Sequence, residues 1–443
     1  MIERTACADI ASWMQTKTHQ ALLVDGARQV GKTTLVREFA RTNYGTYIEI
    51  NFLENRSAME VVSQARDASD LLLRITALSD VQLVPGDTLV FFDEVQEFGD
   101  ILTWAKFLVE QSSYDYVFSG SLLGVDLFGV RSWPVGFMET LTMYPLTFEE
   151  FCRACGTQQS VLDAAHEEVD CCQPVPGFIH DKLMHLHAIY LLIGGLPDAV
   201  QRYVDTKDLV AVRAAHQDIY ELYEYDIARH MSDNEGIRFT QAVFEAIPGQ
   251  LNKENKRFKY ARLDRTGALH KSDLRFSRLE SSFDWLAAAG VALPTLHLDE
   301  PRFPLGLYAD RSKFKLYQND VGLLMSRLTG NVAAEVLAGR RDMNYGSPYE
   351  NYVAQELMAH GHELYYYQTA RRGEIDFVIE DKTSGAVSLV EVKSGKSYKR
   401  HVALSNLLSV GDYEFAHAYV LCNGNCEREG GRTYLPVYAA GWL

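Results

Sequence analysis

The residues that most constrain the fold stand near the start of the chain, in Gly26-Ala-Arg-Gln-Val-Gly-Lys-Thr33. They fit the pattern G-x-x-x-x-G-K-[ST] at every fixed position. The apolar run Ala21–Val24 before them predicts a short buried strand, and an amphipathic helix is expected to follow. In that context the glycines let backbone N–H groups turn toward a phosphate at the helix N-terminus. The stretch therefore predicts a phosphate-binding loop inside an α/β domain.

A second apolar run, Leu89–Phe92, predicts a buried parallel strand that ends in Asp93 and Glu94. With ATP in the loop, Lys32 is expected to reach the β- and γ-phosphates and the Thr33 hydroxyl to hold Mg²⁺. Asp93 is the expected second Mg²⁺ ligand, and Glu94 is placed to polarise the attacking water. If the two carboxylates only capped the next helix, the lysine loop would lack its metal partner. The expected nucleotide contacts are Gly26, Ala27, Arg28, Gln29, Val30, Gly31, Lys32, Thr33, Thr34 and, at the end of a third predicted strand, Ser119.

Length and composition bound the rest of the chain. The 443 residues suggest about three domains, and 47% hydrophobic residues are typical of globular proteins. Apolar runs are too short for a membrane span, and the first residues lack a signal-peptide pattern. Seven cysteines at uneven spacing favour a reducing compartment. We therefore expect a cytoplasmic protein without a membrane contact.

One segment, Lys253–Arg278, is basic although the chain carries a net charge of −16. Such a local inversion of charge is typical of a nucleic-acid contact, here DNA. The alternatives are a solvated face or a surface that meets another protein. A helix after this segment and a strand pair expected in residues 303–318 suggest a winged helix.

Near the C-terminal end, "GEIDFVIEDKTSGAVSLVEVK" predicts two alternating strands joined by a turn at Asp381–Gly385. Folding the hairpin about that turn sets Asp376 opposite Glu391 and Glu374 opposite Lys393, with all four side chains on one face. Cross-strand neighbours lie about 5 Å apart, so the two carboxylates repel unless a cation lies between them. Mg²⁺ or Mn²⁺ suits such oxygen ligands.

The preceding segment, "PYENYVAQELMAHG", predicts a helix that brings Glu350 as a third carboxylate ligand. Gln368 adds a polar group beside the site, and Lys393 is placed to orient a metal-bound water. The alternative is a charged strand face in contact with solvent. The residue types of a catalytic site are all present, but a fold does not imply its function.

Five stretches together resemble a known family: "GARQVGKTT", "FFDEVQ", "FSGSLLG", "YPLTFEEF" and "YLLIGGLPDAV". The chain is similar to prokaryotic AAA-superfamily ATPases of the archaeal-ATPase type, in which a nuclease-like domain of unknown function 4143 follows the ATPase. The resemblance implies an α/β protein with a P-loop, RecA-like ATPase core (1–163), a helical lid (164–235), a winged helix (236–330) and a restriction-endonuclease-like α/β domain (331–443). Arg131 matches the family's arginine after the third-strand loop, acting in cis or in trans, or forming only a salt bridge.

Two functional hypotheses follow from the sequence. The first is a Mg²⁺-dependent ATPase that couples its nucleotide state to a DNA-binding or DNA-cleaving C-terminal region, with Asp376, Glu391 and Lys393 as the cleaving residues. The second is a nucleotide-dependent switch or assembly protein whose nuclease-like domain is a recognition module without catalysis. The oligomeric state is left open, and a homo-oligomer is one alternative.

Overall fold

The computed structural model describes residues 2–16, 20–79, 81–111, 113–121, 134–231, 233–253, 256–260, 263, 276–328 and 346–443. These residues form two units, one of residues 3–144 with 288–290 and one of residues 145–287 with 291–443. Within the described ranges, every helix is too short or too polar to cross a membrane.

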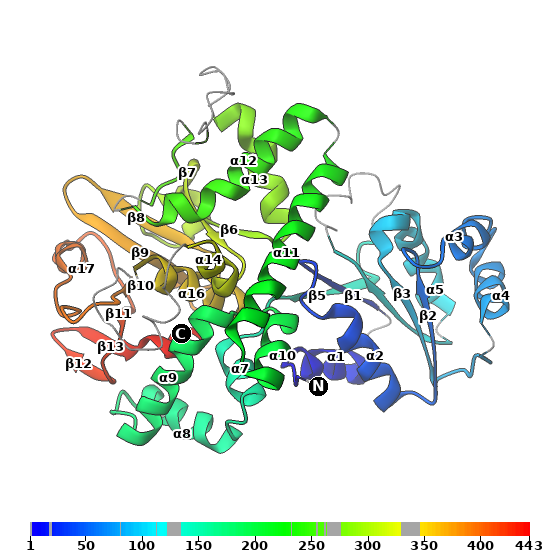
Figure 1. Ribbon diagram of the computed structural model, residues 1–443, viewed down its shortest axis with the longest axis horizontal. Helices are drawn as coiled ribbons and strands as arrows, with labels where there is room; N and C mark the ends of the chain where they lie inside the picture. Colours follow the sequence, from blue (N-terminus) through cyan, green and yellow to red (C-terminus); the bar gives the residue numbers. More distant parts are fainter. Residues whose placement is uncertain are drawn as a thin grey trace. The chain divides into compact units, whose positions relative to one another are not determined.

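The first unit is built on a five-stranded parallel sheet with strand order β2-β3-β4-β1-β5 (Figure 1). Its strands are β1 (Ala21–Gly26), β2 (Thr46–Asn51), β3 (Thr88–Asp93), β4 (Asp115–Ser119) and β5 (Met138–Met143). Its helices are α1 (Ala6–Thr16), α2 (Lys32–Asn43), α3 (Arg56–Ser63), α4 (Ala68–Leu78), the 3-10 helix η1 (Val95–Trp104) and α5 (Ala105–Gln111).

Both faces of this sheet are covered by helices, which explains the continuous apolar runs in its strands. In β3, Leu89 and Phe91 belong to a core shared with α1 and α2, whereas Val90 and Phe92 belong to a core shared with α3, α4, η1 and α5. Because the strands are parallel, their carboxyl ends share one edge of the sheet. The predicted site residues Asp93 and Ser119 end β3 and β4 at that edge.

The second unit contains an eight-stranded mixed sheet with strand order β12-β13-β11-β10-β9-β8-β6-β7 (Figure 1). Its strands are β6 (Ala292–Leu298), β7 (Ala309–Gln318), β8 (Tyr365–Thr369), β9 (Gly373–Asp381), β10 (Ala386–Val392), β11 (His417–Cys422), β12 (Glu427–Glu429) and β13 (Arg432–Pro436). Its helices are α7 (Phe148–Ala154), α8 (Gln159–Asp170), α9 (Gly177–Ile193), α10 (Pro197–Thr206), α11 (Leu209–His230), α12 (Asn234–Leu251), α13 (Phe276–Ala288), η4 (Leu305–Tyr308), α14 (Val321–Arg327), α16 (Gly346–Ala359), α17 (Val402–Leu408) and η5 (Val437–Trp442).

The segment expected to form a winged helix contributes two strands to this sheet. β6 and β7 pair antiparallel with each other, and β6 also pairs in parallel with β8. Residues 303–318 hold one strand, β7, after the short η4, and not the expected strand pair. Residues Leu305–Tyr308 form η4, so the strand begins only at Ala309. The winged-helix assignment stays a prediction.

The C-terminal hairpin has the register that its turn predicts. β9 and β10 pair antiparallel from Asp381 opposite Ala386 to Phe377 opposite Val390. One more residue along the same register sets Asp376 opposite Glu391. Helix α16 packs against both β7 and β10, so it brings its polar side chains to the hairpin.

Candidate functional site

The loop between β1 and α2 depends on its glycines. Gly26 has a φ of 139° and Gly31 a φ of 96°, conformations that L side chains rarely adopt. A Cβ added to Gly26 would lie 2.2 Å from the carbonyl oxygen of Met143. Gln29 also has a positive φ of 66°, which marks the loop as tightly turned. These conformations leave the backbone N–H groups at the start of α2 for an anion.

Lys32 is held over this loop by backbone oxygens. Its Nζ donates to the carbonyl oxygens of Gly26 at 2.8 Å and of Ala27 at 2.7 Å. Burial lowers the pKa of Lys32 to about 8, against the opposing effect of nearby carboxylates, above all Glu94. A buried ammonium that donates to neutral carbonyl oxygens would be stabilised by an anion such as a polyphosphate.

Thr33 and Asp93 meet as the sequence predicts for two ligands of one ion. The Thr33 hydroxyl donates to Asp93 Oδ2 at 2.9 Å, and Asn51 Nδ2 donates to the same oxygen at 3.1 Å. Burial and the neighbouring Glu94 raise the pKa of Asp93, although the Thr33 hydrogen bond opposes them. Hydroxyl and carboxylate oxygens suit Mg²⁺, and a buried carboxylate that forms no ion pair with any described residue favours a cation. The residues fit the ion.

Glu94 follows β3 in a left-handed conformation with a φ of 53°. Gln96 donates to its carboxylate through Nε2 and accepts from the backbone N–H of Ser121 at 3.2 Å. Arg28 Nε donates to the Ser121 hydroxyl at 3.3 Å. These contacts connect the loop, β3 and the segment after β4, so Glu94 has a fixed position beside the Lys32 loop.

The remaining predicted nucleotide residues differ in their surroundings. Ser119 is buried at the end of β4, whereas Thr34 is exposed on α2. Arg131 lies outside the described residues. The sequence analysis missed Asn51 and Gln96. Asn51 is the polar end of β2 and pairs in register with Asp93, which was a usable signal.

The C-terminal hairpin gathers the carboxylates that the sequence predicts. Asp376 is buried and its Oδ2 accepts the backbone N–H of Val392 at 2.8 Å. Glu391 pairs with Lys393, Nζ to Oε1, at 2.5 Å. Gln368 Nε2 donates to Glu374 Oε2 at 2.8 Å. The hairpin face therefore carries three acidic side chains within one hydrogen-bonded cluster.

Lysines from outside the hairpin neutralise this cluster. Lys315, on β7 and 0% exposed, lies 2.5 Å from Glu374 Oε1, 3.7 Å from Glu350 Oε2 and 3.9 Å from Asp376 Oδ1. Lys256 forms an ion pair with Glu350 Oε1. We define the acidic cluster as Glu350, Glu374, Asp376 and Glu391, which three ammonium groups contact, those of Lys256, Lys315 and Lys393.

The pKa values of two carboxyl groups in the acidic cluster shift in opposite directions. Burial would raise the pKa of Glu350, but Lys256, Lys315 and a 3.0 Å hydrogen bond from the Tyr317 hydroxyl lower it. For Asp376, burial and the neighbouring Glu350 and Glu391 raise the pKa well above its ordinary value. Glu350 is thus held ionised by cations, whereas Asp376 favours its proton.

A divalent ion on the acidic cluster fits only in part. Glu391 Oε2 is buried without a hydrogen-bond partner among the described residues, which leaves one oxygen for an ion. However, the carboxylate oxygens of Glu350, Asp376 and Glu391 do not all come within 4.8 Å of one another in the described part of the chain, as the ligands of one ion should. Since Glu350 is already paired with two lysines, the three carboxylates do not fit a metal ion as they stand.

The sequence analysis missed Lys315 and Tyr317, and it assigned Lys256 to a DNA-contacting surface. All three contact Glu350. Lys315 lies in the otherwise apolar segment "FKLY", and a lysine in such a segment is a signal for a buried ion pair. The acidic partners of Lys315 are apparent only from the order of the strands in the sheet. Of the basic segment's other described residues, Lys253 and Lys259 are exposed.

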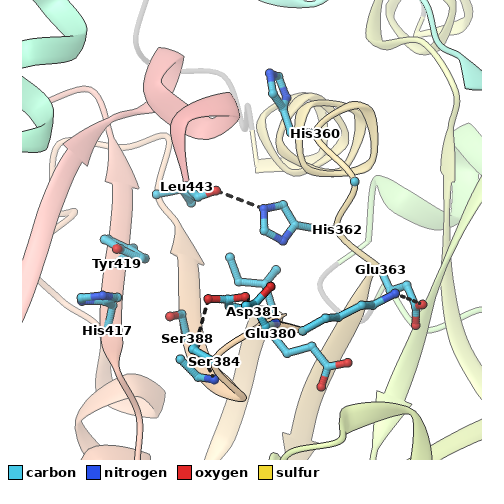
Figure 2. A pocket seen from close by; sticks show the side chains of 15 residues that line it. His360, His362, Glu363, Glu380, Asp381, Ser384, Ser388, His417, Tyr419 and Leu443 are labelled. Atoms are coloured by element: carbon cyan, nitrogen blue, oxygen red, sulfur yellow. Dashed lines mark hydrogen bonds and ion pairs between the residues drawn. The ribbon is translucent and has the colours of Figure 1, made fainter. Parts of the chain in front are cut away.

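A cavity of about 610 Å³ lies at the turn end of the hairpin, away from the acidic cluster (Figure 2). Figure 2 shows Glu380, Asp381 and Ser384 on one side of it and His417 with Tyr419 on β11. Some of the polar groups that line it contact one another, as in the 2.7 Å ion pair of Lys382 with Glu363. This cavity holds none of the predicted site residues.

Three sequence families match successive parts of the chain. A family described as AAA domain matches residues 18–152, and a Domain of unknown function (DUF4143) matches residues 345–439. The chain therefore contains an AAA domain and a C-terminal DUF4143 domain. Between them, a further Domain of unknown function (DUF8612) matches residues 184–333. None of the curated proteins matches the sequence.

Solved structures resemble this AAA-domain protein only distantly. The Walker-type ATPase paby2304 of Pyrococcus abyssi is 14% identical, with a TM-score of 0.43 over 74% of this chain and 96% of that one. The RuvB Holliday junction branch migration motor of Thermotoga maritima is 13% identical, with a TM-score of 0.29 over 71% and 92%. Drosophila ORC bound to DNA is 12% identical, with a TM-score of 0.29 over 75% and 94%. Likeness at this level supports no statement about activity or partners.

Proposed function

We propose that the first unit binds ATP together with Mg²⁺ and hydrolyses it. The observation that carries this proposal is the meeting of Lys32, Thr33 and Asp93 around one glycine-bounded loop. Among the residues that the structure describes, Lys32 Nζ donates to the carbonyls of its own loop, and the Thr33 hydroxyl donates to Asp93 Oδ2. This arrangement provides a cationic group for phosphate and two oxygen ligands for its metal.

The proposed roles follow from these contacts. Lys32 would leave the carbonyl oxygens of Gly26 and Ala27 and pair with the β- and γ-phosphates. Thr33 and Asp93 would hold Mg²⁺, which neutralises charge on the phosphate oxygens when bound. Glu94 would orient the attacking water and accept its proton. Ser119 and Arg131 are proposed to sense the γ-phosphate.

Substitution of Lys32 tests the nucleotide site. In Lys32→Ala, ATP affinity should fall at least about 100-fold, because the main charged contact to the phosphates is lost. Lys106→Ala, which removes a half-exposed lysine of α5 in the same unit, is the matched control and should bind ATP normally. Undiminished ATP affinity in Lys32→Ala would contradict the assignment.

For the second unit we propose a recognition module for DNA, controlled by the nucleotide state of the first. The neutralisation of the acidic cluster supports this, since Lys256 and Lys315 already pair with Glu350. The exposed Lys253 and Lys259 remain as phosphate contacts within the segment Lys253–Arg278. Metal-dependent DNA cleavage at Asp376 and Glu391 is the second candidate, favoured by the partnerless Oε2 of Glu391.

The salt dependence of DNA binding tests the recognition role. Log affinity for duplex DNA should fall linearly with log salt concentration, because bound lysines release counterions. Lys253→Gln with Lys259→Gln should weaken binding and reduce that slope. Replacement of two exposed lysines elsewhere in this unit, Lys382→Gln with Lys399→Gln, is the control. Absent or salt-independent binding would favour a protein partner, as in the nucleotide-dependent switch.

A further inference from the structure

Three ligand-type side chains converge at one end of the β6–β7 pair, outside the acidic cluster. His297 Nδ1 or Nε2 and carboxylate oxygens of Asp299 and Asp310 lie within 4.8 Å of one another. Among the described residues, no other group of three or more His, Cys, Asp or Glu side chains brings its ligand atoms this close together. His297 pairs with Asp310 across the strands, next to a shift in register after Leu296 that redirects the local side chains.

His297 is oriented as a metal ligand would be. The residue is only 8% exposed, and its Nε2 lies 2.9 Å from the carbonyl oxygen of Gln368. A carbonyl oxygen only accepts, so Nε2 carries a proton, and in the neutral imidazole Nδ1 keeps its lone pair. Nδ1 has no hydrogen-bond partner among the described residues and lies 3.6 Å from Asp299 Oδ1. Metal-ligating histidines typically donate their other ring N–H in this way.

A lysine ammonium lies between the two carboxylates. Lys313 Nζ is 2.6 Å from Asp310 Oδ2 and 3.7 Å from Asp299 Oδ1, and its side chain is 34% exposed. Asp310 also accepts from the backbone N–H and the hydroxyl of Ser312, at 2.9 and 2.6 Å. These bonds fix one carboxylate, while the half-exposed lysine is free to turn into solvent when another cation replaces it.

We propose that His297 Nδ1, Asp299 and Asp310 form a binding site for a divalent first-row transition-metal ion such as Zn²⁺ or Mn²⁺, and that the ion displaces Lys313. An imidazole nitrogen with two carboxylates favours such ions over Ca²⁺ and Mg²⁺, which prefer oxygen ligands alone. This site is separate from the Mg²⁺ site proposed at Thr33 and Asp93.

The site is connected to the acidic cluster through hydrogen bonds. The peptide carbonyl of Gln368 accepts from His297, and the Gln368 side chain donates to Glu374, which pairs with Lys315. A bound ion would therefore fix the end of β8 next to the hairpin face. It would take no part in ATP hydrolysis.

The test is a titration of the full chain, free of nucleotide and Mg²⁺, with Zn²⁺ in competition with a chromophoric chelator. One site is expected, and His297→Gln and Asp299→Asn should each weaken it at least about 100-fold, beyond the 10–100-fold of an outer-shell change. Lys313→Met should tighten binding, because the competing ammonium is gone. Ca²⁺ should bind more weakly than Zn²⁺.

Two variants keep the test decisive. Asp299 is 68% exposed, so Asp299→Asn should fold even if His297→Gln does not. Glu427→Gln, which removes a half-exposed carboxylate elsewhere in the same unit, should leave Zn²⁺ affinity unchanged. Wild-type affinity in Asp299→Asn, unchanged affinity in Lys313→Met, or loss of Zn²⁺ binding in Glu427→Gln would each overturn the proposal.

Discussion

The two units both bury acidic side chains beside lysines, but they pair them differently. In the first unit Lys32 contacts backbone carbonyls, and Asp93 accepts from the Thr33 hydroxyl and the Asn51 amide. In the second unit Lys256 and Lys315 contact carboxylates directly. Within the described ranges, neither Lys32 nor Asp93 forms a direct ion pair, so the ammonium can pair with a phosphate and the carboxylate with a metal ion. In the second arrangement, the lysines largely neutralise the carboxylates.

Helix α16 shows the same principle within one element. Lys256 and Lys315 lower the pKa of Glu350, although burial opposes them. Glu356, on the same helix, accepts one backbone N–H, that of Phe148, at 2.9 Å. Burial raises the pKa of Glu356 to about 8 despite that hydrogen bond. The difference between these two buried carboxylates of α16 thus follows from the lysines that contact Glu350.

The largest effect is expected from Glu94→Gln in the first unit. The variant keeps the shape of the side chain and removes the base, so ATP turnover should fall about 10²–10⁴-fold while ATP still binds. Steady-state hydrolysis and equilibrium binding on the same sample measure both. Glu110→Gln, half-exposed on α5, is the control. Unchanged turnover would show that Glu94 does not act on water.

The next largest effect is expected from Lys315→Met in the second unit. Removing one partner of a buried ion pair leaves uncompensated charge on Glu350 and Glu374 and should destabilise the fold by about 3–5 kcal/mol. Denaturant unfolding measures the loss. Lys399→Met breaks a half-exposed pair with Glu427 and should cost less than about 1 kcal/mol. Equal losses in the two variants would contradict the neutralising role of Lys315.

The smallest effect concerns pH and Glu356. The folded state keeps the proton up to about pH 8, whereas the unfolded chain releases it near the ordinary value of 4.5. The stability that this group contributes is full below pH 4.5 and is lost as the pH rises to 8. Glu356→Gln should flatten this slope and add about 1–3 kcal/mol to the unfolding free energy at pH 8. The exposed Glu427→Gln should leave the slope as it is; a wild-type slope in Glu356→Gln would contradict the assignment.

The features that could be predicted from the sequence are those formed by residues close together in the chain. The loop at Gly26–Thr33, the strand that ends at Asp93 and the hairpin register all follow from residues close in sequence. Lys315 was missed because β7 reaches the cluster only through sheet order and through α16. The ligand set at His297 was missed for a similar reason, since its histidine is oriented by the backbone of Gln368 on another strand. Contacts between residues far apart in the chain leave little pattern in the local sequence.

One paired assay tests the central claim, that the first unit holds a working site and the acidic cluster a neutralised one. ATP hydrolysis and plasmid integrity are followed in the same reaction with ATP and Mg²⁺ or Mn²⁺, for the wild type, Asp93→Asn and Asp376→Asn. We predict that hydrolysis is lost only in Asp93→Asn and that the plasmid stays intact in every sample. Metal-dependent plasmid cleavage that Asp376→Asn abolishes, or hydrolysis that persists in Asp93→Asn, would contradict the account.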